Sequence, residues 1–199
     1  KKSSAPILLY HAVGEPVEIE WPPGMILPAS LFEEHLQYLT QEEYQIITVA
    51  ELAERLKFGY SVEKFVAMSF DDGYRNNHSE ALPLLKKYNA KASFYIVDRD
   101  IGKTIYMNQS QLLDLLASDM EIGSHTINHA PLALIDPKYL PWEIGSAKKF
   151  LEKKLNGYVL QGKAYPNGGY NANVINAMQE YGFVYGLTGK VGANTHQNF

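Results

Sequence analysis

The chain has 199 residues, of which 46% are hydrophobic and 20% are charged, and its formal net charge is −4. This length allows one domain with a sizeable core, and this composition excludes a disordered or fibrous protein. We therefore expect a single domain over residues 1–199. The weak acidic balance argues against a nucleic-acid partner, and the lack of cysteine leaves only histidine, aspartate and glutamate as side-chain metal ligands.

Short segments rich in β-branched and aromatic residues alternate with longer segments of helical spacing along the whole chain. In chain order, strands are predicted at 7–11, 45–49, 65–70, 91–97, 121–125, 159–165 and 183–188, and helices at 30–39, 51–58, 79–88, 110–117, 141–155 and 171–181. This alternation of strands and helices indicates a sheet of parallel strands in which each strand is joined to the next by a helix. We expect an α/β fold built as a closed or nearly closed barrel, with a doubly wound open sheet as the alternative.

Polar residues follow several of the predicted strands. They are Tyr10-His11, Asp71-Asp72, His125 and the run from Pro166 to Gly168. Both candidate folds place their sites at the carboxyl ends of the strands. The irregular segment 14–30 follows the first strand, so we predict a loop over the same rim.

SHTINH, residues 124–129, is the strongest local signal for chemistry. His125 and His129 stand four residues apart after a strand, a spacing at which two imidazoles can bind one cation if the chain turns helically. Asp71 and Asp72 end another strand and point in different directions, so one carboxylate can complete the metal site while the other faces a bound water. Asp-Asp-Gly is also a common turn sequence, and this simpler interpretation stays open for the pair alone.

Nothing in the chain predicts a membrane-spanning helix. No apolar run approaches the roughly 20 residues that a bilayer requires, and no signal peptide is recognisable. The opening KKSSAP looks like a trimmed start, so export stays open.

SFDDGY (69–74) and SHTINH, taken together and in this order, resemble the first two motifs of the polysaccharide deacetylases of carbohydrate esterase family 4, the NodB homology domain. The resemblance covers essentially the whole chain. It implies a distorted, incomplete (β/α) barrel with about seven parallel strands, which removes N-acetyl groups from sugar polymers with a divalent metal. Carried over by position, Asp71 is the catalytic base, and Asp72, His125 and His129 are the metal ligands.

The first strand ends in Tyr-His within ILLYHAVG. This resembles the branch of poly-N-acetylglucosamine deacetylases, in which the motifs are circularly rearranged and His11 takes the role of general acid. A histidine can protonate a leaving amine because its ordinary pKa is about 6.5. A structural histidine at the barrel mouth is the competing interpretation.

The third motif departs from the family pattern. Ala164 stands where the family places an arginine that holds the basic aspartate, and Arg75 and Lys163 are the nearest candidates to replace it. The resemblance also implies that the backbone amide of Asn167 forms part of the oxyanion hole, a role that does not depend on the side chain.

Four aromatic residues are candidate platforms for sugar rings, although packing is the more ordinary use of each. They are Trp21, Tyr74, Trp142 and Tyr170. Trp21, in the rim loop, is our first choice for substrate contact, and we also assign Tyr74 to substrate binding.

The resemblance predicts a monomeric, extracellular or cell-surface hydrolase that releases acetate from an N-acetylglucosamine polymer, such as the poly-N-acetylglucosamine of biofilms or the peptidoglycan of the cell wall. Zinc is the expected metal, and cobalt, nickel and iron also suit two histidines and one aspartate. The alternatives are an O-acetyl esterase acting on xylan, a catalytically silent carbohydrate-binding module, and an iron oxygenase with an antiparallel barrel.

Overall fold

The computed structural model describes residues 4–15 and 24–195. Its main sheet has seven strands in the order β1-β5-β6-β7-β8-β9, with β4 paired to β5 as well, and every pairing is parallel. The strands are β1 (Ile7–Tyr10), β4 (Gln45–Ile47), β5 (Phe65–Phe70), β6 (Ser93–Ile96), β7 (Glu121–Ser124), β8 (Gly162–Ala164) and β9 (Tyr185–Leu187). All seven predicted strands are confirmed, each with ends within a few residues of those expected.

The sheet curls into half of a barrel, so the expectation of a distorted, incomplete barrel is confirmed. Strands β4 and β6 share one edge of β5, because Phe65–Ala67 pairs with β4 while Ser69–Phe70 pairs with β6. The two outer strands, β1 and β9, do not pair with each other. The parallel sheet also argues against an oxygenase with an antiparallel barrel.

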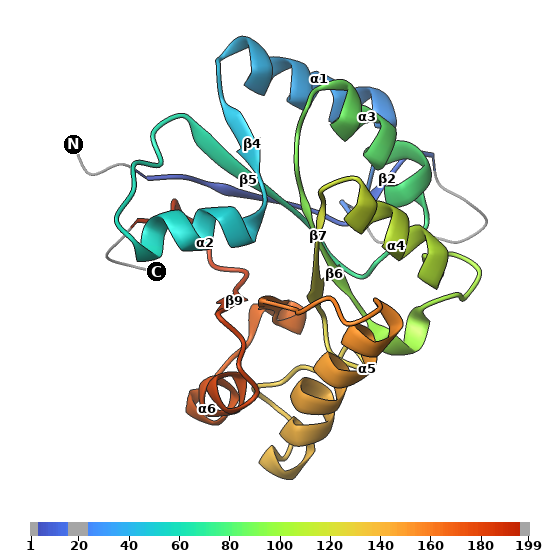
Figure 1. Cartoon of the computed structure of the whole chain (residues 1–199), viewed down its shortest axis with the longest axis vertical. Coiled ribbons are helices and arrows are strands. Elements are labelled where there is room, and N and C mark those ends of the chain that lie inside the picture. The colour runs from blue at the N-terminus through green and yellow to red at the C-terminus, as the bar shows by residue number, and fades with distance from the viewer. Residues whose placement is uncertain (1–3, 16–23, 196–199) are drawn as a thin grey trace.

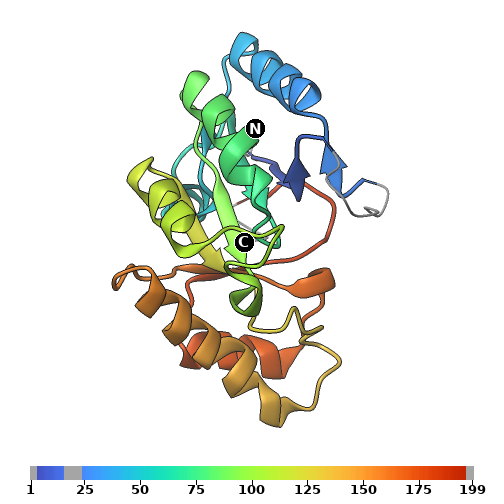
Figure 2. The ribbon, with the colours of Figure 1, turned by 90° about the vertical axis from the view of Figure 1, so that its right-hand side faces the viewer.

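Helices pack on both faces of this sheet (Figures 1 and 2). They are α1 (Ala29–Gln41), α2 (Val49–Lys57), α3 (Leu82–Lys87), α4 (Gln109–Ala117), α5 (Ala147–Lys154) and α6 (Ala172–Glu180). Helices α1 and α3–α6 bury apolar side chains against the outer, convex face, in one large core. Helix α2 instead contributes Val49, Leu52 and Leu56 to a second core on the inner face, together with Tyr95 and Tyr185.

Side-chain caps explain where several helices begin. Thr48 and Glu51 form a capping box at the start of α2, and Asn108 and Gln111 form another at the start of α4. Each box satisfies two backbone N–H groups that have no partner within the helix. The apolar periodicity therefore predicts the helix, and the cap fixes its first turn.

Tyrosine rings fill the inner face of the half-barrel by lying over glycines on neighbouring strands. Tyr95 on β6 faces Gly123 on β7, and Tyr185 on β9 faces Gly162 on β8. A Cβ atom at either glycine would collide with the ring opposite. Glycine is therefore required at both positions for close approach rather than for a turn.

The structure differs from the sequence predictions in detail. The segment expected to be irregular contains β3 (Ile26–Leu27), which pairs in parallel with β2 (Ala12–Val13) in a separate small sheet. The predicted helices 79–88 and 141–155 each open with a π-helical stretch, Asn77–Ala81 and Pro141–Ser146. Two-residue strands carry too little periodicity to be recognised in a sequence.

Candidate metal centre and active site

The acidic pair that follows β5 forms both a turn and a site. The Gly73 N–H donates to the Asp71 carbonyl oxygen at 3.0 Å, closing a three-residue turn around Asp72. Asp72 lies in the left-handed region with φ of 71°, a turn geometry that is rare and strained. The turn interpretation of the pair is therefore confirmed, and it does not conflict with a role in a site, because both residues also line the cavity described below.

The histidine pair lies in the loop after β7. His125 is 2% exposed, whereas the side chain of His129 is 38% exposed. The Nδ1–H of His125 donates to the Ala164 carbonyl oxygen at 2.9 Å, which leaves Nε2 as the ring nitrogen that faces Asp72. Burial, with a smaller effect of His129, lowers the pKa of His125 to about 3, so this imidazole is neutral at pH 7, as metal binding requires.

Asp72, His125 and His129 converge on one point. Nε2 of His125 lies 3.5 Å from Asp72 Oδ1, and Nε2 of His129 lies 3.4 Å from the same oxygen. Each of the three residues offers one ligand atom, and these atoms all lie within 4.8 Å of one another. Two imidazole nitrogens and one carboxylate oxygen suit a divalent transition metal and leave coordination positions open, as at catalytic zinc sites.

Asp71 lies beside this triad and is not part of it. One of its carboxylate oxygens, Oδ1, is buried and accepts no hydrogen bond from the described residues. Burial, and secondarily the Asp72 carboxylate, raise the pKa of Asp71 to about 8. A cation held beside Asp72 would oppose this rise, because its positive charge favours the ionised carboxylate.

His11 follows β1, the strand that pairs with β5, and lines the same cavity as Asp71. The Asp71 N–H donates to the Tyr10 carbonyl oxygen at 3.0 Å, which continues the pairing of β1 with β5 beyond their last residues. Burial lowers the pKa of His11, while the Asp72 carboxylate partly opposes that change. The His11 imidazole is therefore within electrostatic range of Asp72 and His129.

Asn167 lies on the other wall of the site, in the turn Pro166–Gly168 that follows β8. Its φ is 57°, a conformation that asparagine tolerates better than most residues other than glycine. The Gly168 N–H donates to the Tyr165 carbonyl oxygen at 2.7 Å and closes this turn. The local sequence thus explains the turn that brings Asn167 to the rim.

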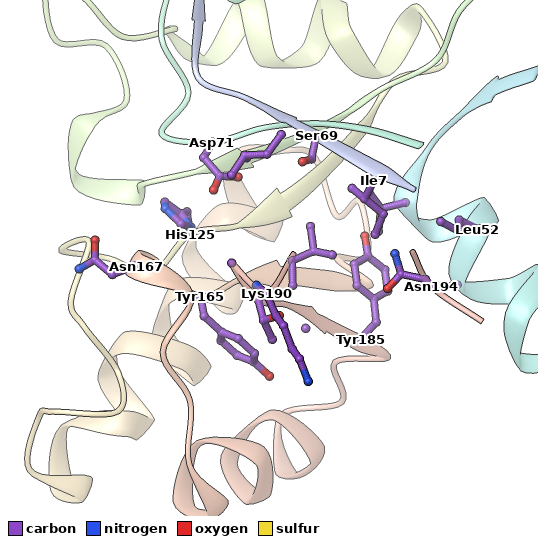
Figure 3. Close-up of a pocket in the computed structure, with 18 of the residues that line it drawn as sticks. Ile7, Leu52, Ser69, Asp71, His125, Tyr165, Asn167, Tyr185, Lys190 and Asn194 are labelled. Carbon is purple, nitrogen blue, oxygen red and sulfur yellow. The ribbon is translucent and has the colours of Figure 1, made fainter. Parts of the chain in front are cut away.

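All these residues line one cavity of about 630 Å³ that runs down the inner face of the half-barrel (Figure 3). Asp71, His125 and Asn167 lie at one end of it, and Ile7, Leu52 and Asn194 lie toward the other. Along β1, alternate residues face the cavity, as expected for a strand: His11, Leu9 and Ile7 line it, while Tyr10 and Leu8 pack against the outer core.

The predicted sugar platforms are placed differently from one another. Tyr74 is 8% exposed and does not line the cavity; its ring stacks on Tyr106, and burial together with the nearby Asp72 carboxylate raises the pKa of its hydroxyl. Tyr170 is 51% exposed and stacks on Tyr165, a cavity residue. Trp142 packs edge-on against Phe150. Trp21 lies outside the described residues.

Both candidates for the missing arginine make contacts elsewhere. The exposed Arg75 donates through its guanidinium to the Lys103 carbonyl oxygen at 3.4 Å. Lys163 is fully buried, and its Nζ donates to Ser124 Oγ at 2.8 Å and to the Glu143 carbonyl oxygen at 3.3 Å. Ala164 contributes its backbone carbonyl to His125 rather than a side chain to Asp71.

Sequence reasoning missed Glu143, Tyr165 and Tyr185. Glu143 is buried beside the histidine loop, and both tyrosines line the cavity. Glu143 carries a signal in the sequence, because it falls on the apolar stripe of its helix, three residues after Leu140 and four before Ala147. The tyrosines carry none, since aromatic residues in strands are ordinary core residues.

Comparisons with known proteins show which family this chain resembles. A family model described as polysaccharide deacetylase matches residues 59–186. A Bacillus subtilis protein named as a polysaccharide deacetylase, YxkH, is 30% identical over 97% of this chain and 67% of its own length. The poly-beta-1,6-N-acetyl-D-glucosamine N-deacetylase of Staphylococcus epidermidis is 28% identical over 79% of this chain and 59% of its own.

Among solved structures, the deacetylase PplD of Streptococcus pyogenes in complex with acetate is similar over 100% of this chain and 89% of its own. The TM-score is 0.88 and the sequence identity 27%. The chain spans roughly three fifths to two thirds of the length of the two curated relatives described above.

Proposed function

This chain belongs to the polysaccharide deacetylase family, and we propose that it hydrolyses N-acetyl groups of an N-acetylglucosamine polymer in a metal-dependent reaction that releases acetate. One observation carries the proposal. The three potential ligands Asp72, His125 and His129 share one cavity with His11 and with Asp71, a carboxylate that is not part of this triad.

In this proposal Asp72, His125 and His129 hold a divalent metal, most suitably zinc, with cobalt, nickel or iron as alternatives that the same ligands accept. When bound, such a metal supplies Lewis acidity and lowers the pKa of a coordinated water. The Nδ1–H of His125 donates to the Ala164 carbonyl oxygen, and this hydrogen bond fixes the orientation of the ring. Nε2 of the neutral imidazole is therefore already oriented to bind the metal.

Asp71 and His11 carry out the two proton transfers, and Asn167 stabilises the negative charge that forms between them. Asp71 removes a proton from the attacking water, because it is the carboxylate in the cavity that is not needed as a ligand. The Asn167 N–H donates to the oxygen that becomes negative during attack. His11, which lines the same cavity, protonates the amine as the carbon–nitrogen bond breaks.

Two similarities support the substrate class. The relative from Staphylococcus epidermidis is named for poly-beta-1,6-N-acetyl-D-glucosamine, and the PplD structure contains acetate, the product expected here. Peptidoglycan presents the same acetamido group, and acetylated xylan presents an ester in its place. Because these polymers lie outside the cell, we also propose an extracellular or cell-surface location. Among the described residues, no helix is both long and apolar enough to cross a bilayer.

The test is acetate release from N-acetylglucosamine oligomers by metal-free protein to which zinc or cobalt is returned. Asp71→Asn is expected to lower turnover by at least about 100-fold, the smaller end of general-base effects, while metal binding is retained. Asp119→Asn is the matched control, because this exposed residue has φ of 60°, which asparagine accepts equally well. Full activity after Asp71→Asn, or after chelation, would refute the proposal.

One observation favours a second function, a catalytically silent carbohydrate-binding module. Ala164 replaces the arginine expected from the family, and Asp71 Oδ1 has no hydrogen-bond partner among the described residues. An unsupported base would leave binding intact and turnover low. Binding of acetylated oligomers without acetate release, at a site loaded with metal, would favour this function over the first.

A further inference from the structure

Glu143 lies on the π-helical stretch Pro141–Ser146 and is 4% exposed. Its carboxylate points at the loop that carries both histidines. Oε2 accepts from the backbone N–H groups of Ile127 and Asn128, each at 3.0 Å, and Oε1 accepts from Asn128 Nδ2 at 2.6 Å. Ile127 and Asn128 lie between His125 and His129 in the sequence, so one buried carboxylate binds the middle of the loop.

The loop adopts a conformation that its sequence does not favour. Thr126 has φ of 69° and His129 has φ of 55°, and a β-branched residue in this region is a genuine outlier. Such conformations persist only where the surroundings fix them. Thr126 is held in part by its own contacts, since its Oγ1 accepts from the Ala130 N–H at 3.1 Å and its carbonyl oxygen accepts from the Asp98 N–H at 3.1 Å.

A second buried ionisable residue, Lys163, connects the same parts of the molecule. Lys163 Nζ donates to Ser124 Oγ, directly before His125, and to the backbone carbonyl oxygen of Glu143. Lys163 thus ties the start of the loop to the helix turn that carries the Glu143 carboxylate. The two ionisable residues, from β8 and from the turn before α5, hold the loop at its start and at its middle.

We propose that Glu143 is a positioning residue that fixes the separation of the two imidazoles and thereby sets the affinity of the site for metal. The inference rests on the proposed function, because it takes His125 and His129 as ligands. A neutral side chain cannot replace the carboxylate fully, since three N–H donors converge on it in a buried place. Groups that orient ligands in this way usually change metal affinity by about 10- to 100-fold when they are removed.

The experiment titrates metal-free protein with Co²⁺ and Zn²⁺ and measures the dissociation constant from the visible spectrum and by calorimetry. Glu143→Ala is expected to weaken binding by about 10- to 100-fold. Glu143→Gln keeps one acceptor oxygen and is expected to fall between Glu143→Ala and the wild type. Glu152→Gln is the matched control, because Glu152 lies on the adjoining helix α5 and accepts from the Leu160 N–H at 3.0 Å without contacting the loop.

The outcomes separate this inference from the proposed function. If the wild-type protein binds neither Co²⁺ nor Zn²⁺, the proposed function and the inference about Glu143 are both wrong. Wild-type protein that binds metal, with Glu143→Ala binding equally tightly, overturns the inference alone. A purely structural role predicts that thermal unfolding of the metal-free protein shifts while the dissociation constant of the folded protein does not, and that result also overturns it. If Glu143→Ala does not fold, the affinity of Glu143→Gln relative to Glu152→Gln decides.

Discussion

The fully buried Lys163 makes a quantitative prediction about stability. Burial, which Glu143 opposes only in part, lowers the pKa of this lysine from 10.5 to about 7. Between these two values the unfolded chain binds more protons than the folded one, so the free energy of unfolding rises with pH. Below pH 7 both forms are protonated and the full cost of the buried charge is present; above pH 10.5 both forms are neutral and the cost is gone.

Lys163→Met replaces the ammonium group with an apolar side chain of similar length. The difference between 10.5 and about 7 corresponds to about 5 kcal/mol, at about 1.4 kcal/mol for each pH unit. We therefore expect the unfolding free energy of the wild type, measured relative to that of Lys163→Met, to rise by about 5 kcal/mol between pH 6.5 and pH 10.5. The lost hydrogen bonds to Ser124 Oγ and the Glu143 carbonyl subtract about 1 kcal/mol each from the variant at every pH.

The assay is urea unfolding of metal-free wild type and Lys163→Met, followed by circular dichroism at intervals of half a pH unit. The difference between the two proteins isolates Lys163, because the other groups titrate in both. Parallel curves across this range would show that the lysine stays charged in the folded protein, and the reasoning from burial would then be wrong.

Two further variants test contacts around the site. Gly162→Ala places a methyl group against the ring of Tyr185, and we expect a loss of stability of about 1–3 kcal/mol, seen as a lower urea midpoint; an unchanged midpoint would mean that the ring moves freely. Tyr74→Phe removes a hydroxyl whose pKa is raised by burial and by the nearby Asp72 carboxylate, and it should weaken metal binding by about 10-fold in a cobalt titration. Tyr106→Phe, which keeps the stacked ring beside Tyr74, is its control, and equal affinities for the two variants would contradict a positioning role for the Tyr74 hydroxyl.

The order of the secondary structure follows from the sequence alone. Apolar periodicity and caps such as Thr48 act over a few residues, so the seven strands of the main sheet and the positions of the helices were predictable. The triad was predictable for a related reason. Asp72 and His125 follow strands of a parallel fold, and the carboxyl ends of such strands meet at one rim.

Tertiary structure decided what each side chain faces. Tyr74 lies two residues after Asp72 in the sequence, yet its ring stacks on Tyr106 and does not line the cavity. Glu143 lies 18 residues after His125, and only the packing of its helix against β7 and β8 brings the carboxylate to the loop. Such contacts depend on strand order and sheet curvature, which arise from the whole chain, whereas periodicity and capping are local. The sequence therefore specified the candidate ligands and the elements that carry them, and the fold decided which buried group, Glu143, contacts the loop between the two histidines.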